Sequence, residues 1–78
     1  MRLYLYALDD GRHPIKWHPA KNEDVARRKL KSLIEAWCIK HPLFPLSGYT
    51  RGWIDEDGVE HIDFGSHRVF GLIKKGEN

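Results

Sequence analysis

The last third of the chain, residues 49–73, constrains the fold most, because it holds two turn sequences that fix how successive strands align. The Asp-Glu-Asp-Gly segment at 55–58 is typical of a type I turn followed by a left-handed glycine. It predicts a three-residue hairpin loop that pairs Trp53 with His61.

A second turn is indicated by the Gly-Ser pair at 65–66, which suits a two-residue turn with glycine first. This turn would pair Asp63 with Arg68, while the first loop pairs Arg51 with Asp63. Together they predict a charge row across three strands. The sheet face expected under a helix carries Thr50, Gly52, Ile54, Ile62, Phe64, Val69, Gly71 and Ile73.

A single helix of about 18 residues is predicted, starting near Asn22. Asn22 is a suitable N-cap, and Pro42 ends the helix close to Lys40. Its apolar stripe comprises Ala26, Leu30, Leu33, Ile34, Trp37 and Cys38. We expect Leu33 and Trp37 to be buried against Ile54, Ile62 and Val69.

The N-terminal segment, residues 2–8, alternates in the manner of a strand. If Leu3 and Leu5 face the core, then Tyr4 and Tyr6 join the opposite face of the sheet, together with Arg2. The segment 12–20 contains two His-Pro pairs and is expected to be a connector.

These elements predict an α+β fold, in which one helix packs on one face of a small, mainly antiparallel sheet in the order β-α-β-β-β. A chain of 78 residues forms one domain, residues 1–78, and buries only about 60% of its unfolded surface. The pattern leaves open where the first strand joins the sheet.

Composition narrows the class of protein. No apolar run approaches the ~18 residues of a membrane span, so no membrane association is expected. Cys38 is the only cysteine, which suits a reducing, cytoplasmic setting. The formal net charge of +2 is compatible with nucleic-acid binding but does not by itself indicate it.

Nothing in the sequence points to catalysis. There is no phosphate-binding glycine loop, nucleophile elbow or paired-cysteine site. His61 and Asp63 share a face but lack a third metal ligand. We therefore expect no enzyme activity, no metal and no cofactor.

The face expected to lie opposite the helix is the best functional clue, because it mixes aromatic rings with arginines. It carries Tyr49, Arg51, Trp53, His61, Asp63, Arg68 and Phe70. Three interpretations stay open: cover by Ile15 and Trp17 of the connector, contact with a protein, or stacking of nucleic-acid bases. The predicted partner-binding residues are Arg51, Trp53, His61, Arg68, Phe70, Tyr4, Tyr6, and Arg27, Arg28 and Lys31 of the basic helix face.

In size alone, the chain resembles small stand-alone accessory proteins of phages and mobile elements. Such proteins often block host machinery, including defence complexes. The resemblance implies a similar role, but it assigns that role to no particular residue. The leading hypothesis is a non-enzymatic binding protein that docks on a larger protein or nucleoprotein complex and inhibits or adapts it. The alternative is direct nucleic-acid binding, and the oligomeric state stays open.

Overall fold

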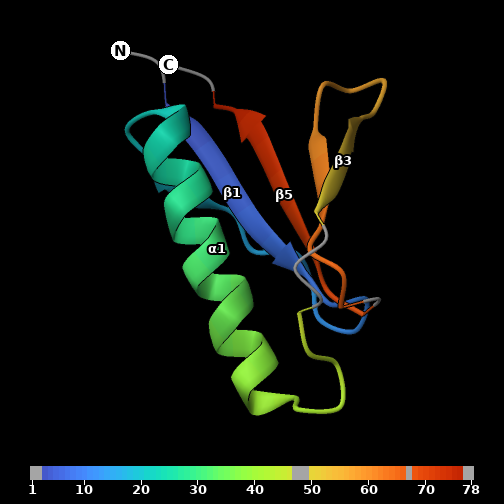
Figure 1. Ribbon diagram of the computed structural model, residues 1–78. Coiled ribbons are helices and arrows are strands. Elements are labelled where there is room, and N and C mark those ends of the chain that lie inside the picture. Colours follow the sequence, from blue (N-terminus) through green and yellow to red (C-terminus); the bar gives the residue numbers. More distant parts are fainter. Residues whose placement is uncertain (1–2, 47–49, 67, 77–78) are drawn as a thin grey trace.

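The computed structural model describes residues 3–46, 50–66 and 68–76. Within these ranges, five strands form one antiparallel sheet in the order β2-β1-β5-β4-β3, with one helix packed on one face (Figure 1). The predicted fold class is confirmed. Arg2 and Tyr49, which the sequence assigns to a sheet face, lie outside the described residues. The elements are β1 (Tyr4–Asp9), β2 (His18–Ala20), α1 (Glu23–Lys40), β3 (Arg51–Ile54), β4 (Glu60–Asp63) and β5 (Phe70–Lys75).

Helix α1 begins and ends where the sequence predicts. The side chain of Asn22 accepts a hydrogen bond from the Val25 amide (2.9 Å), and so caps the first turn. The His41 amide donates to the Cys38 carbonyl before Pro42 stops the helix. No helix in the described ranges is long and apolar enough to cross a membrane.

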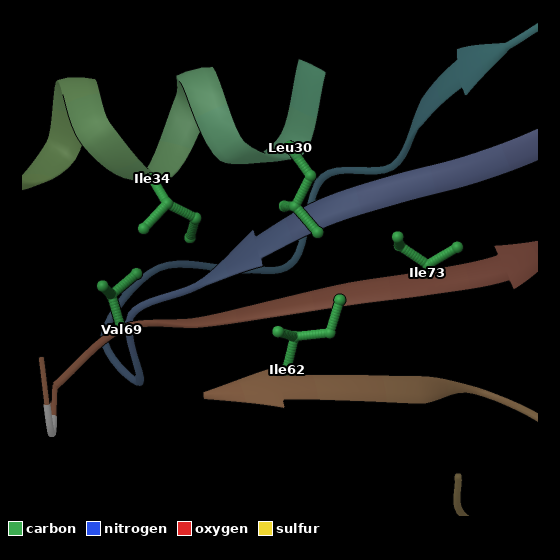
Figure 2. Packing of buried hydrophobic residues seen from close by; sticks show 5 residues of the cluster. All are labelled: Leu30, Ile34, Ile62, Val69 and Ile73. Carbon is green, nitrogen blue, oxygen red and sulfur yellow. The ribbon is translucent and has the colours of Figure 1, made fainter. Parts of the chain in front are cut away.

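The core lies between α1 and the middle of the sheet. Leu30 and Ile34 point down from the helix onto Ile62, Val69 and Ile73 (Figure 2). Burial of these side chains from water is the main force that holds the two layers together.

Gly71 lets the helix approach the sheet closely. A Cβ at this position would lie 2.6 Å from Leu30 Cδ2, so any side chain would displace Leu30. The sequence anticipated such an approach, with Trp37 as the helix residue. In the structure Leu30 takes this place, and Trp37 packs half-buried beside the core.

Two expected core residues are placed wrongly by the sequence. Leu33 is only half-buried and lies outside the core cluster, and Ile54 is 69% exposed. The reason is the position of α1, which lies over β1, β2 and β5 and leaves β3 uncovered (Figure 1).

The two faces of β1 are the reverse of those expected. Tyr6 pairs with Ile73 and Leu8 with Gly71, so Tyr4, Tyr6 and Leu8 point toward the helix and pack on the core. Leu3 and Leu5 therefore point away from it. Both alternating sets are apolar enough to be buried, and a period of two does not say which set faces the helix.

Part of the predicted connector forms strand β2, which pairs with β1 at one edge of the sheet. Pro19 sits inside this strand although it has no amide hydrogen to donate. An edge strand tolerates proline where its nitrogen points away from the sheet.

The predicted register holds in the β3–β4 hairpin and fails between β4 and β5. Trp53 pairs with His61, and Gly58 has a φ of 82° in the three-residue loop, as predicted. Asp63 pairs with Phe70 instead of Arg68. The shift is two residues, so side chains on β5 keep the faces assigned to them.

The longer β4–β5 loop is held by its own side chains. Gly65 donates to Asp63 Oδ1 (2.8 Å), and the Val69 amide donates to Ser66 Oγ (3.1 Å). These side-chain bonds to backbone satisfy the loop without a two-residue turn.

Candidate functional site

The sheet face opposite α1, here called the second face, displays a tryptophan that is exposed and firmly held. The Trp53 and His61 rings stack across β3 and β4, with centroids 5.3 Å apart and planes 2° apart. His61 Nε2 lies 2.8 Å from Asp55 Oδ2. Trp53 is nevertheless 47% exposed. One face of the indole ring thus stacks on His61, while much of the ring contacts solvent.

Asp55 fixes this arrangement from the end of β3. Its Oδ1 accepts hydrogen bonds from the amides of Asp57 (2.9 Å) and Val59 (3.0 Å). The bond from His61, and then the one from the Val59 amide, hold the pKa of Asp55 below its usual range. The carboxylate is therefore ionised at neutral pH and orients the His61 ring.

Arg51 lies on the same face, next to a buried acid. Its Nε is 3.4 Å from Asp63 Oδ2, and Phe70 lies opposite Asp63 on the next strand. The Arg51 side chain remains 64% exposed. The predicted Arg51–Asp63 pair is confirmed, and this pairing offsets much of the positive charge of the guanidinium group.

The other end of the second face is covered by the chain itself. The Lys74 ammonium lies 4.2 Å from the centre of the Trp17 ring, and Trp17 is half-buried. Between this pair and Trp53, Ala7 and Leu72 are buried. Cover by the connector, one of the alternatives left open by the sequence, thus applies to one end of the face. The β3 end stays open.

Three residues that the sequence assigned to this face lie away from it. Tyr4 and Tyr6 point toward the helix, as described above. Arg68 lies in the β4–β5 loop, where its guanidinium group sits over the Phe44 ring (5.8 Å to the centroid). The predicted three-strand charge row does not form, because the longer loop carries Arg68 beyond the sheet.

The basic residues of α1 behave differently from one another. Arg27 donates to Glu23 (3.0 Å) and to both carboxylate oxygens of Glu60, and its pKa is raised chiefly by the bond to Glu60. Arg27 therefore ties the helix to β4. Arg28 and Lys31 are exposed, and neither forms an ion pair within the described part of the chain.

A groove of about 510 Å³ between α1 and β1–β2 was not foreseen from the sequence. Tyr6 and His18 stack at 5.2 Å along its wall. A neighbouring hollow of about 310 Å³ shares His18, Leu33 and Ala36 with it. The groove lies between α1 and the strand pair β1–β2, and no local sequence signal marks β2.

Three kinds of side chain with catalytic or metal-binding chemistry can be placed: potential metal ligands, the Cys38 thiol and the Ser66 hydroxyl. The described residues contain no group of three histidine, cysteine or acidic side chains placed to hold a metal ion. Burial raises the pKa of the Cys38 thiol, which keeps it protonated. The Ser66 hydroxyl is buried and bonded to the backbone of its own turn.

Searches among protein families, curated proteins and solved structures returned no match for this chain. Any assignment of function therefore rests on the geometry of the second face and on the chemistry of its residues.

Proposed function

We propose that the protein is a non-enzymatic binding protein, which docks on a larger protein or nucleoprotein complex and inhibits or adapts it. The observation that carries the proposal is Trp53, exposed on the second face and held by His61 and Asp55. The contact would centre on Trp53, with Arg51 beside it and Phe70 further along the face.

A fixed, exposed tryptophan is well suited to protein recognition. Tryptophan and arginine are enriched among the residues that dominate binding free energy at protein interfaces. Because the Trp53 ring already stacks on His61, little side-chain entropy is lost when a partner covers it. Polar groups of Arg51 and Asp55 surround the ring, as polar rims surround the centre of protein interfaces.

Direct nucleic-acid binding is the second candidate, favoured by the exposed Arg28 and Lys31 on α1. The second face supports it less well. Arg51 is paired with Asp63, and the two tyrosines expected as stacking platforms pack toward the helix instead. Among the described residues, few unpaired cations lie beside Trp53 to contact phosphates.

The decisive experiment is an affinity pull-down from cells of the native host, with nuclease treatment, followed by affinity measurement on the captured partner. We expect Trp53→Ala to weaken binding by about 2 kcal/mol or more, as truncation of interface tryptophans does. Ile39→Ala is the matched control, because it removes another exposed apolar side chain, one carried by α1.

Salt dependence separates the two candidates. The affinity of a protein contact around Trp53 should fall little as the salt concentration rises. Phosphate contacts instead give a steep fall in affinity. Arg28→Ala and Lys31→Ala would then each reduce the slope of log affinity against log salt concentration by about one. Equal affinities for Trp53→Ala, Ile39→Ala and the unaltered protein would contradict the proposed site.

A further inference from the structure

The two edges of the sheet differ in their readiness to pair with another strand. At one edge, Pro19 in β2 has no amide hydrogen to offer outward. At the other edge, all four residues of β3 are exposed, and α1 leaves this strand uncovered (Figure 1). An exposed strand edge is a template for a further strand.

The hairpin loop determines which backbone groups of β3 point outward. Asp55 donates its amide to the Val59 carbonyl and accepts from the Gly58 amide, so its backbone groups face β4. In an antiparallel ladder this direction alternates from residue to residue. Trp53 therefore also faces β4 with its backbone, while the N–H and C=O groups of Gly52 and Ile54 point outward and have no strand partner within residues 3–46, 50–66 and 68–76.

We propose that β3 pairs antiparallel with β3 of a second copy of the chain, around a two-fold axis at Trp53. This register places Gly52 opposite Ile54 of the other copy and forms about four ladder hydrogen bonds. The two five-stranded sheets would join into one continuous sheet.

Charge and ring chemistry on the second face favour this register. It sets Arg51, which stays 64% exposed beside Asp63, opposite Asp55 of the other copy, twice by symmetry, and Trp53 opposite Trp53. Opposite charges and aromatic pairs are the cross-strand neighbours that stabilise sheets. Shifting the axis to Gly52 or to Ile54 would break both the Arg51–Asp55 pairs and the tryptophan pair.

The helix-side face also accommodates the pairing. Ile54 is 69% exposed there, and in the proposed register it lies beside Gly52 of the other copy, which has no side chain to obstruct it. The pairing therefore covers the Ile54 side chain, which α1 does not contact. It also sets two Trp53 rings side by side on one enlarged second face.

The first test measures the oligomeric state of the purified protein by sedimentation equilibrium. We expect a concentration-dependent dimer. Ile54→Pro removes an outward amide and no bond to β4, so it should raise the dimer dissociation constant about ten-fold or more. Ile54→Thr, which keeps that amide, should change it less. A protein that stays monomeric at every concentration would overturn the proposal.

The second test fixes the register by disulfide trapping in a Cys38→Ser background. A non-hydrogen-bonded antiparallel pair brings two Cα atoms to about 4.5 Å, within the range of a disulfide. Trp53→Cys should therefore cross-link two chains on oxidation, and Ile54→Cys should not. Cross-linking of Ile54→Cys alone would refute pairing around Trp53. Neither test involves a partner protein, so its failure is distinct from failure of the proposed function.

Discussion

At the scale of single residues, two carboxylates organise the turns that shape this molecule. Asp10 accepts hydrogen bonds from the amides of Arg12 and His13 (2.9 Å each), where the chain turns after β1. Bonds from the backbone of His13 and then of Arg12 hold the pKa of Asp10 far below its usual range. Asp55 likewise accepts hydrogen bonds from backbone amides of the β3–β4 loop, and its side chain also bonds to His61.

The lowered pKa of Asp55 predicts a loss of stability in acid. A carboxylate whose pKa is lower in the folded state than its ordinary value of 3.8 stabilises the fold above that value. This contribution disappears as pH falls through the folded pKa. We expect the thermal midpoint to fall as pH drops below about 4, and to fall less in Asp55→Asn.

Asp57→Asn is the control for this acid effect, because it changes a carboxylate in the same hairpin loop. Thermal unfolding followed by circular dichroism would measure all three proteins across the acid range. Identical acid profiles for Asp55→Asn and the unaltered protein would show that the Asp55 bonds contribute nothing to stability.

At the scale of elements, the placement of α1 decides which apolar residues form the core. Leu30 and Ile34 are buried against the middle of the sheet, whereas Leu33 lies along the groove beside β1 and β2. Arg27 fixes this placement from the side by its bonds to Glu60 on β4. One side of the apolar stripe of α1 is therefore fully buried, and the other side, which includes Leu33, is only partly buried.

Truncating the two leucines of α1 should separate these edges. Leu30→Ala should lower the free energy of unfolding by about 2–5 kcal/mol, since it opens a cavity among fully buried side chains. Leu33→Ala should cost clearly less, because part of its side chain already contacts solvent. Urea denaturation of both variants measures the difference. Equal losses would mean that Leu33 belongs to the core after all.

At the scale of the whole molecule, the sheet is covered unevenly. Helix α1 packs over β1, β2 and β5, and the β3–β4 hairpin extends beyond it (Figure 1). Hairpins with little packing on one face open more readily than strands under a helix. Both proposals place their contacts at this thinly covered end, where a partner strand or surface would bury what α1 does not.

Native-state hydrogen exchange should reveal this unevenness. In dilute protein, we expect the β3–β4 ladder amides, such as that of Trp53, to exchange faster than those of β1 and β5. At high concentration, the outward amides of Gly52 and Ile54 should gain protection if β3 pairs with a second copy. Uniform protection across all strands would contradict the uneven cover.

The sequence by itself determined what local chemistry controls. The Asn22 cap and Pro42 fixed the helix, because both act on the nearest backbone groups. The loop at 55–58 fixed the β3–β4 register, and with it the Trp53–His61 and Arg51–Asp63 pairs of the candidate site. A short loop with a left-handed glycine allows few alignments of the strands beside it.

Only the tertiary structure decided what depends on contacts between distant segments. Both faces of β1 are apolar, so packing against α1, and not alternation, turned Tyr4 and Tyr6 inward. Strand β2 forms by pairing with the edge of β1. The β4–β5 loop is longer than predicted because the side chains of Ser66 and Asp63 accept hydrogen bonds from its backbone. Whether the second face is open at Trp53 or covered at Trp17 depends on where the helix and connector settle, and no local pattern specifies that position.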